Sequence, residues 1–91
     1  MMEFKTEEGR IWLPDAAGSM AAEVLFPAGS DGTVQITHTF VDDSLRGQGV
    51  AGRLMEAAAQ KLRADGKKAK PVCSYAVAWF EKHPEYADVL A

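Results

Sequence analysis

The chain has 91 residues, which is enough for one hydrophobic core and too few for two. Its formal net charge of −3 gives no indication of general nucleic-acid binding, and its 47% of apolar and 25% of charged residues are typical of a soluble globular protein. We therefore expect a single domain over residues 1–91 that has no nucleic-acid partner.

A single cysteine and the character of the N-terminus indicate the compartment. Cys73 has no second cysteine to pair with, which excludes an internal disulfide and a multi-cysteine zinc site and is typical of a reducing compartment. The segment MMEFKTEEGR is charged and lacks the apolar core of a signal peptide, and no apolar run approaches the length of a membrane span. We expect a cytoplasmic protein without a membrane partner. Because the two histidines are isolated in their segments, and the pair Asp42-Asp43 is typical of a capping turn, we expect no metal site.

The first half of the chain has the pattern of an antiparallel meander. Residues 10–13 are β-prone and end at Pro14, residues 19–26 are rich in apolar side chains, and a dense turn signal follows over 27–32. The segment TVQITHTFV (33–41) is rich in β-branched and aromatic residues and predicts the clearest strand, while residues 2–6 are a candidate for a further short one. Because side chains alternate along a strand, we expect those of the clearest strand to lie on two faces. One face carries Val34, Ile36, His38 and Phe40, and the other carries Thr33, Gln35, Thr37, Thr39 and Val41.

The second half changes to a helical period. Apolar residues spaced for one helical face predict a helix over 49–65, and Gly66 is a suitable stop for it. Residues 68–73 predict a short strand and residues 74–82 a second helix, from which we expect Val77 and Phe80 to face inward, followed by Tyr86 in a last helical turn opened by Pro84. The order β-β-β-α-β-α, with parallel strands before and after the first helix, predicts an α/β (α+β) fold with an antiparallel-rich mixed sheet and two main helices.

The segment LRGQGVAG (45–52) places three glycines directly before the first helix. The first turn of a helix has backbone N–H groups without partners and a partial positive charge, and glycines let a ligand approach these groups closely. The arrangement suits phosphate or pyrophosphate, and Arg46 adds a fixed charge and a bidentate donor. The alternative is a purely structural turn in which Gly52 packs closely against the sheet.

Residues 46–51 fit the pattern R-x-x-G-x-A, which resembles the pyrophosphate loop of the GCN5-related N-acetyltransferases, Q/R-x-x-G-x-G/A. Four blocks in order are similar to a small subfamily of minimal proteins of this class, the YjdJ type: HTFV (38–41), LRGQGVA (45–51), PVCSYA (71–76) and HPEY (83–86). The resemblance spans most of the chain from Arg10 and implies a minimal acyl-CoA N-acyltransferase-like fold that binds acetyl-CoA. Full-length members of the superfamily carry further helices and strands that build the acceptor pocket, and we expect this chain to lack them.

The resemblance also implies which residues meet acetyl-CoA. The N–H groups from Gln48 to Gly52 face the pyrophosphate, and the thioester lies beside the strand that ends near Val41. Lys67, Lys68 or the loop arginine meets the phosphates of the adenosine end. The implied cofactor-binding residues are Phe40, Val41, Arg46, Gly47, Gln48, Gly49, Val50, Ala51, Gly52, Ser74 and Tyr75.

Cys73 and His38 are the candidate catalytic residues, and for each of them a structural role is also open. The position of Cys73 between a strand end and a helix suits a thiolate, and the resemblance implies an active-site cysteine that takes the acetyl group as a thioester or acts as an acid. The alternative is a small buried apolar residue. His38 is a structural residue, a general base for an amine acceptor, or the partner that activates Cys73. Ser74 suits a helix cap as well as ligand binding, and Tyr75 suits core packing, a contact with pantetheine, or protonation of the leaving thiolate.

The first functional hypothesis is an acetyl-CoA-binding minimal N-acetyltransferase, a monomer or weak homodimer, that transfers acetyl to an unidentified amine acceptor, directly or through Cys73. The alternative from another class is a non-catalytic acyl-CoA-binding or regulatory module, which the expected lack of acceptor-pocket segments favours. A third hypothesis is a small interaction domain whose glycine turn is structural. Only the enzyme hypothesis requires Cys73 or His38 for turnover.

Overall fold

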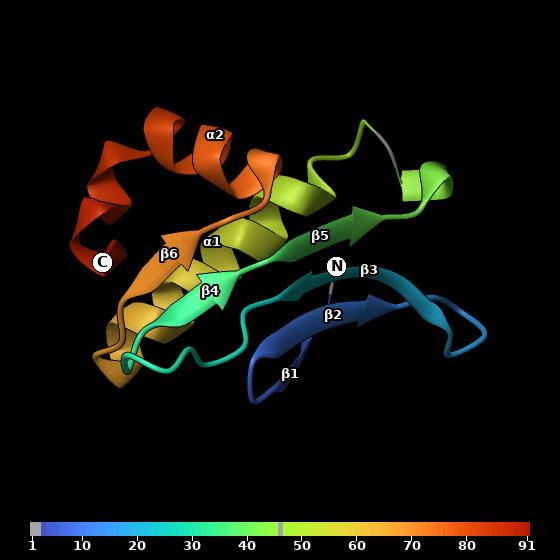
Figure 1. Cartoon of the computed structure of the whole chain (residues 1–91). Helices are drawn as coiled ribbons and strands as arrows, with labels where there is room; N and C mark the ends of the chain where they lie inside the picture. Colours follow the sequence, from blue (N-terminus) through green and yellow to red (C-terminus); the bar gives the residue numbers. More distant parts are fainter. Residues whose placement is uncertain (1–2, 46) are drawn as a thin grey trace.

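Two small sheets make up the strand-rich part of the chain. The computed structural model describes residues 3–45 and 47–91. Four antiparallel strands pair in the order β1-β2-β3-β5, and β4 and β6 form a separate parallel pair (Figure 1). The strands are β1 (Lys5–Glu7), β2 (Arg10–Pro14), β3 (Met20–Leu25), β4 (Val34–Ile36), β5 (His38–Val41) and β6 (Ala69–Pro71).

The helices follow the predicted order. They are α1 (Val50–Asp65), α2 (Ser74–Lys82) and two short 3₁₀ helices, η1 (Asp43–Leu45) and η2 (Pro84–Val89). The prediction of an antiparallel meander, a long helix, a parallel strand and a second helix is confirmed, and the candidate short strand at 2–6 is found as β1, over Lys5–Glu7, as the hairpin partner of β2. In Figure 1, α1 crosses behind the strands and α2 lies beside it along the side of β6.

A β-bulge divides the predicted strand 33–41 into β4 and β5. Before the bulge, the Thr37 N–H donates to the Leu25 carbonyl at 3.1 Å, in register with the bridge between Ala28 and Val34. After the bulge, His38 itself is the partner of Leu25. Thr37 and His38 therefore both oppose one residue of β3, and this extra residue shifts the alternation of the strand.

The bulge reverses which side chains of β5 face the core. Thr39 and Val41 are half-buried, whereas His38 and Phe40 are exposed. The predicted grouping of His38 and Phe40 with the buried pair of β4 is therefore wrong, because strict alternation does not hold across an inserted residue.

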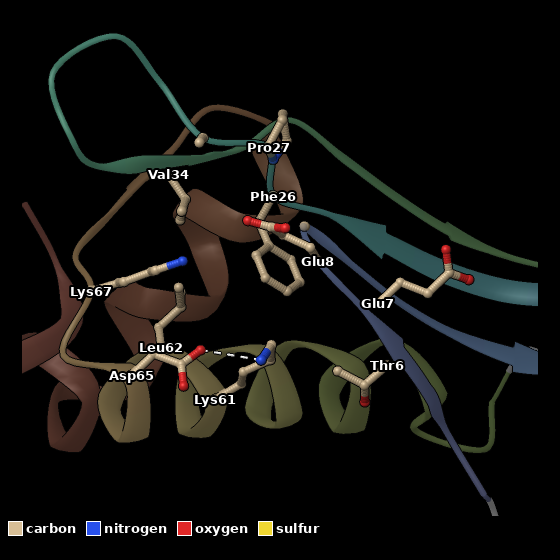
Figure 2. Close-up of a pocket in the computed structure, with 12 residues that line it drawn as sticks. Thr6, Glu7, Glu8, Phe26, Pro27, Val34, Lys61, Leu62, Asp65 and Lys67 are labelled. Carbon is tan, nitrogen blue, oxygen red and sulfur yellow. Dashed lines mark hydrogen bonds and ion pairs between the residues drawn. The ribbon is translucent and has the colours of Figure 1, made fainter.

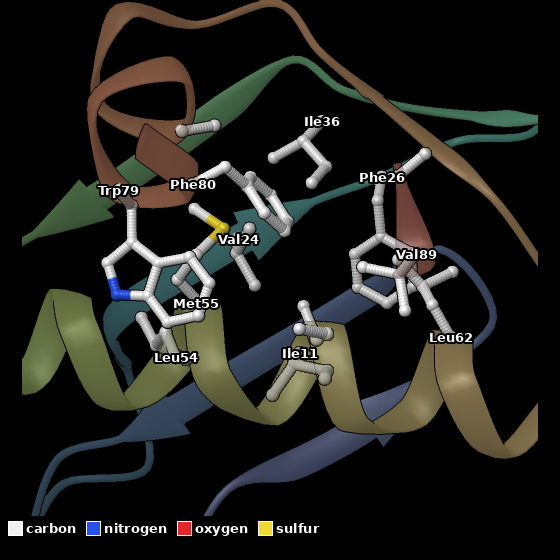
Figure 3. Packing of buried hydrophobic residues seen from close by; sticks show 14 of the residues in the cluster. Ile11, Val24, Phe26, Ile36, Leu54, Met55, Leu62, Trp79, Phe80 and Val89 are labelled. Atoms are coloured by element: carbon white, nitrogen blue, oxygen red, sulfur yellow. The ribbon is translucent and has the colours of Figure 1, made fainter. Parts of the chain in front are cut away.

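The core fills the space between α1, α2 and one face of the strands. Val24 of β3, Leu54 and Met55 of α1 and Trp79 and Phe80 of α2 meet there (Figure 3). The buried side chains of α2 are spaced at i, i+3 and i+4, beginning at Ala76. Val77 is off this stripe and 40% exposed, so its predicted inward position is wrong, whereas those of Phe80 and Tyr86 are confirmed.

The strands β4 and β6 separate immediately after their parallel pairing. The Ile36 carbonyl accepts hydrogen bonds from the N–H groups of Val72 and Cys73, at 2.9 and 3.1 Å, and the chain then enters α2. The neighbouring strand β5 continues with β3 on one edge. In the described part of the chain no strand pairs with its other edge, so a gap opens between β5 and the start of α2.

Candidate functional site

The N-terminus of α1 is left without a side-chain cap by the described residues. The N-cap is Gly49, in the left-handed conformation at φ 71°, and the first turn holds no acidic residue. Gly47 also has a positive φ, 82°, a region that L side chains rarely adopt. The N–H groups of Val50, Ala51 and Gly52 belong to the first turn, whose N–H groups have no intrahelical partner. Arg46, a predicted site residue, lies outside the described residues.

Two adjoining hollows open at this helix start. The smaller has a volume of about 240 Å³ and the larger about 460 Å³, and they share the lining residues Gly49, Gly52 and Tyr75, so they lie next to each other; we call the two together the groove. The smaller hollow is lined by Val41, Leu45, Gly47, Gly49, Val50, Ala51, Gly52 and Tyr75. The larger is lined by Gly49, Gly52, Arg53, Glu56, Tyr75, Ala78, Trp79, Lys82 and His83. A Cβ on Gly52 would lie 3.7 Å from the Tyr75 hydroxyl, so the glycine keeps the groove open where the hollows join.

The larger hollow combines cations with an aromatic wall. Arg53 and Lys82 carry positive charge into it from α1 and α2. The rings of Trp79 and His83 are stacked at a centroid distance of 4.0 Å, and the His83 ring nitrogen Nδ1 is 2.8 Å from the Trp79 carbonyl oxygen. Burial raises the pKa of the Tyr75 hydroxyl above its ordinary value, so this side chain stays a neutral donor at physiological pH.

The basic residues expected at the adenosine end lie elsewhere. Lys67 lines a different pocket at the C-terminal end of α1, and the Lys68 ammonium donates to the Asp88 carbonyl. The 16 residues of α1 separate both lysines from the glycine loop by about 24 Å. Both lysines therefore lie at the other end of α1 from the loop, and the cations that line the groove are Arg53 and Lys82.

The free edge of β5 faces the gap with two backbone N–H groups. The Asp42 N–H donates to the Ala21 carbonyl of the β3 side at 2.8 Å. Because N–H groups alternate between the two edges of a strand, those of Val41 and Thr39 point away from β3 and toward the gap. The bulge sets this direction, since the register of the residues before the bulge, if it continued through residues 38–41, would turn these groups toward β3.

Cys73 lies at the inner end of the gap, as the N-cap of α2. Its Sγ is 3.6 Å from the Thr39 hydroxyl, so the cysteine contacts β5 across the gap. The thiol is half-buried and packs against the core. The expected position between a strand and a helix is confirmed. The predicted bounds of α2, 74–82, are confirmed, and Ser74 is its first residue rather than its cap, because Cys73 occupies the N-cap position.

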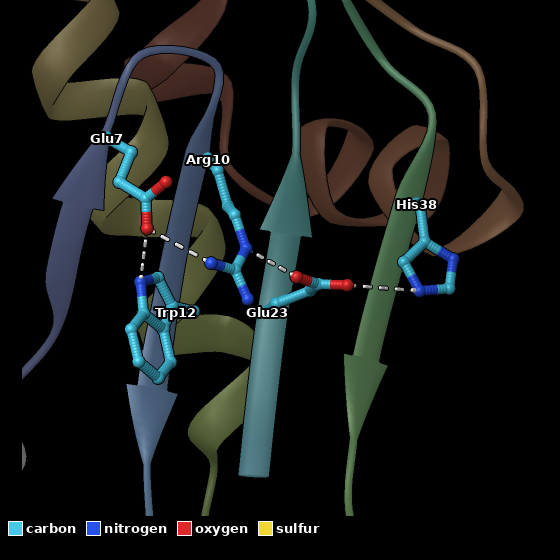
Figure 4. Close-up of polar contacts among 5 residues, drawn as sticks. All are labelled: Glu7, Arg10, Trp12, Glu23 and His38. Atoms are coloured by element: carbon cyan, nitrogen blue, oxygen red, sulfur yellow. Dashed lines mark hydrogen bonds and ion pairs between the residues drawn. The ribbon is translucent and has the colours of Figure 1, made fainter. Parts of the chain in front are cut away.

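His38 lies on the opposite face of β5 from Thr39 and points to the open face of the sheet. Its Nε2 is 3.9 Å from Oε1 of Glu23, whose Oε2 accepts a hydrogen bond from Arg10 Nε at 2.7 Å (Figure 4). Glu7 completes the network by accepting from Arg10 and from the Trp12 indole. The polar partner of His38 is therefore Glu23, and the thiol partner expected for it, Cys73, instead contacts Thr39.

The structure brings part of the predicted set together. The predicted residues that line the groove are Val41, Gly47, Gly49, Val50, Ala51, Gly52 and Tyr75. Phe40, on the open sheet face, Gln48 and Ser74 are outside its lining. Sequence reasoning missed Arg53, Trp79 and Lys82, although Tyr75, Trp79 and Lys82 are spaced at i, i+4 and i+7 and so share one face of a helix.

Metal clusters and membrane-spanning helices are both absent from the described residues. No group of three or more His, Cys, Asp or Glu side chains in residues 3–45 and 47–91 is arranged to hold a metal ion. Among those residues, too, no helix has the length and apolar character needed to cross a membrane.

Solved structures define the class of this fold. Ard1 from Thermoplasma volcanium matches over 84% of this chain and 54% of its own, with a TM-score of 0.64 and 21% identity. An acetyltransferase of the GNAT family from Staphylococcus aureus Mu50 matches over 82% of this chain and 50% of its own, with a TM-score of 0.64 and 8% identity. The fold is that of the acyl-CoA N-acyltransferases, and the chain spans about half the length of these two proteins.

A smaller protein and a family model identify the family. A GCN5-like protein of Staphylococcus aureus, solved by NMR, is 31% identical, with a TM-score of 0.80 over 99% of this chain and 88% of its own. The model of the family described as GCN5-related N-acetyl-transferase matches residues 10–89. The chain belongs to the GCN5-related N-acetyltransferase family. A search of curated proteins finds no match.

Proposed function

We propose that the chain binds acetyl-CoA in the groove between α1, β5 and α2. The observation that carries this proposal is the uncapped start of α1, whose first-turn N–H groups line a groove that is open enough for a ligand. The pyrophosphate accepts hydrogen bonds from Val50, Ala51 and Gly52. The nucleotide end lies in the larger hollow, where Arg53 and Lys82 supply positive charge for its phosphates.

The thioester end extends into the gap beside β5. The N–H groups of Thr39 and Val41 are directed there and bind carbonyl oxygens by hydrogen bonds. Acetyl-CoA supplies an activated acyl group, and an amine acceptor forms the C–N bond while the C–S bond breaks. The Tyr75 hydroxyl lies at the junction of the two hollows as a neutral proton donor for the leaving thiolate. In the two-step route, the Cys73 thiol takes the acetyl group first and passes it to the amine.

The acceptor amine approaches from the open face of the sheet. His38 lies on this face next to the gap, and as a general base it takes the proton that the amine loses. Glu23 orients the imidazole, while Arg10 holds the carboxylate in place. Glu23 is thus a positioning residue and His38 the catalytic residue of this pair.

Native mass spectrometry of the protein mixed with acetyl-CoA tests the binding step. We expect a one-to-one complex with acetyl-CoA and with CoA, because both carry the pyrophosphate. Acetylated protein that is absent from the Cys73→Ser variant indicates the two-step route, and a complex without acetylated protein indicates direct transfer. Failure of both ligands to bind at about 1 mM contradicts the proposed site.

The second candidate function is a non-catalytic acyl-CoA-binding or regulatory module. An amine screen with acetyl-CoA separates the two, since only the enzyme releases CoA in the presence of an acceptor.

A double-mutant cycle then tests the roles of His38 and Glu23. If Glu23 acts through His38, the variants His38→Gln and Glu23→Gln lower kcat/KM, and the double variant is no slower than His38→Gln alone. Glu7→Gln is the matched control, because Glu7 binds the same arginine but not the histidine. Additive losses in the double variant contradict the assignment of Glu23.

A further inference from the structure

A third hollow, larger than either half of the proposed acetyl-CoA groove, lies at the opposite end of α1. Its volume is about 680 Å³, within the range of small-molecule pockets. It is bounded by the β1–β2 turn, by residues 26–28 after β3, by Val34 and by the last turns of α1 with Lys67. None of these residues lines the groove at the other end.

The floor of this pocket is apolar and rigid. Phe26, Val34 and Leu62 are 3%, 5% and 1% exposed and belong to the hydrophobic core. Pro27 and Ala28 extend the apolar lining along one side. A ligand that fills the pocket therefore buries an apolar body against side chains that are already fixed by packing.

A carboxylate is held at one side of the pocket by a tight turn. Glu8 and Gly9 form the two-residue turn between the paired residues Glu7 and Arg10. Gly9 has a φ of 75°, and its carbonyl accepts a hydrogen bond of 2.8 Å from the N–H of Phe26, which ties the turn to the pocket floor. The position of Glu8 is thus fixed relative to the apolar lining.

An ammonium is held at the other side by the end of α1. The N–H groups of Gly66 and Lys67 donate to the carbonyls of Arg63 and Leu62, at 3.2 and 2.9 Å, in the arrangement of a Schellman motif. Lys67 is therefore fixed beside Leu62. In Figure 2 its side chain extends toward the middle of the pocket, and the carboxylate of Glu8 lies on the far side, next to Phe26.

The other charged groups at the pocket have partners in the protein. The Glu7 carboxylate accepts from Arg10 and Trp12, and Lys61 pairs with Asp65 at 3.1 Å. Among the described residues, the side chains of Glu8 and Lys67 have no hydrogen bond or ion pair. The pocket therefore offers one available negative charge and one available positive charge on opposite sides of an apolar floor.

We propose that this pocket binds a small zwitterion with an apolar body, of the kind represented by an apolar α-amino acid. Its ammonium pairs with Glu8, its carboxylate pairs with Lys67, and its side chain covers Phe26 and Leu62. The pocket is a second ligand site, independent of acyl-CoA binding, because α1 separates the two sites by about 24 Å of helix.

NMR titration of the ¹⁵N-labelled protein tests the proposal with three probes: L-phenylalanine, phenethylamine and 3-phenylpropionate. We expect L-phenylalanine to shift amides of residues 6–9, 26–28 and 61–67 and to bind about tenfold more tightly than either analogue, which each lack one charge. Glu8→Gln should remove the preference over 3-phenylpropionate, and Lys67→Gln should remove the preference over phenethylamine. Glu81→Gln and Lys5→Gln are matched controls, because these exposed side chains do not line the pocket.

Two results would overturn the proposal. The first is the absence of amide shifts in these segments with L-phenylalanine at about 10 mM. The second is equal binding of the three probes by the wild type, or a preference for L-phenylalanine that persists when Glu8→Gln and Lys67→Gln are combined. Either outcome would show that the two charges do not select the ligand. Neither result affects the acetyl-CoA site, whose signals come from residues 39–52.

Discussion

The two ends of α1 use glycine in the same backbone conformation for opposite purposes. Gly66 closes the C-terminal end, where two N–H groups beyond the helix satisfy carbonyls of its last turn. Gly49 begins the N-terminal end, where no described side chain satisfies the N–H groups of the first turn. The comparison teaches that the φ of a glycine does not reveal its role. What decides the role is whether the backbone groups beside it meet the protein or an open groove.

This difference has an energetic consequence. Glycine in place of a side-chain cap at a helix N-terminus typically costs about a few tenths of a kcal/mol, which α1 gives up at Gly49. A ligand bound there restores the missing hydrogen bonds and stabilises the fold, by about 2.7 kcal/mol at a concentration of one hundred times Kd. The N-terminal end of α1 is thus the end at which ligand binding and folding stability are coupled.

The largest effect expected from this comparison is on acetyl-CoA affinity. Gly49→Ala and Gly66→Ala each place an L side chain at positive φ, and each should cost about 1–2 kcal/mol of folding free energy. For a domain of this size the cost corresponds to about 4–8 °C in Tm per kcal/mol. Only Gly49→Ala should also weaken acetyl-CoA binding, by about tenfold or more, in calorimetric titration of the folded protein. Equal acetyl-CoA affinities of the two variants would contradict a role in binding for Gly49 that Gly66 does not share.

At Gly52 we expect smaller effects, with opposite signs for stability and for acetyl-CoA affinity. This glycine lies inside α1 without a positive φ, and the space beyond its Cα allows a Cβ at ordinary contact distance from Tyr75 and Trp79. Gly52→Ala should therefore stabilise the fold by up to about 1 kcal/mol through helix propensity. Because the new Cβ enters the groove, acetyl-CoA affinity should fall several-fold. Thermal melts and titrations measure both, and a gain in stability with unchanged affinity would show that the ligand does not pass Gly52.

The smallest effect concerns the link between the C-terminal end of α1 and η2. Arg63 donates to both carboxylate oxygens of Asp88, at 2.8 and 2.6 Å, and this holds the pKa of Asp88 below its ordinary value. A lowered pKa in the folded state contributes stability above the unfolded value near 4, and the contribution is lost as the pH falls through the folded value.

Asp88→Asn should therefore lower Tm slightly at pH 7, and its difference from the wild type should shrink below about pH 4. Acetyl-CoA affinity should not change, because the pair is at the far end of the helix. Thermal melts across pH measure the first effect. A difference that grows toward acid pH would contradict a lowered pKa of Asp88 in the folded state.

The bounds of both helices and the glycine loop were predictable because their signals are local. Gly66 and the 3.6-residue period place the end of α1 at Asp65, and Gly49 precedes its first residue. The groove lining from Gly47 to Gly52 follows from the same segment. These features depend on neighbours within a few residues, which the sequence displays directly.

The bulge and the network around Glu23 were not predictable from the sequence. Thr37 and His38 both oppose Leu25 only because β4 and β5 pair with segments far along the chain. Glu23 meets His38 across the β3–β5 pairing, and Arg10 joins it from β2. Such contacts depend on the register between strands, for which alternation within a single strand carries no information.

The bulge takes up one residue between the two halves of this strand. Deletion of Thr37 would remove the bulge and leave His38 opposite Leu25 on the open face, because regular alternation from the buried Ile36 gives His38 the same orientation. Loss of this one residue is therefore absorbed at the bulge without turning over the side chains of β5. The sequences of β4 and β5 can therefore change independently, because β4 packs in the core whereas β5 borders the gap.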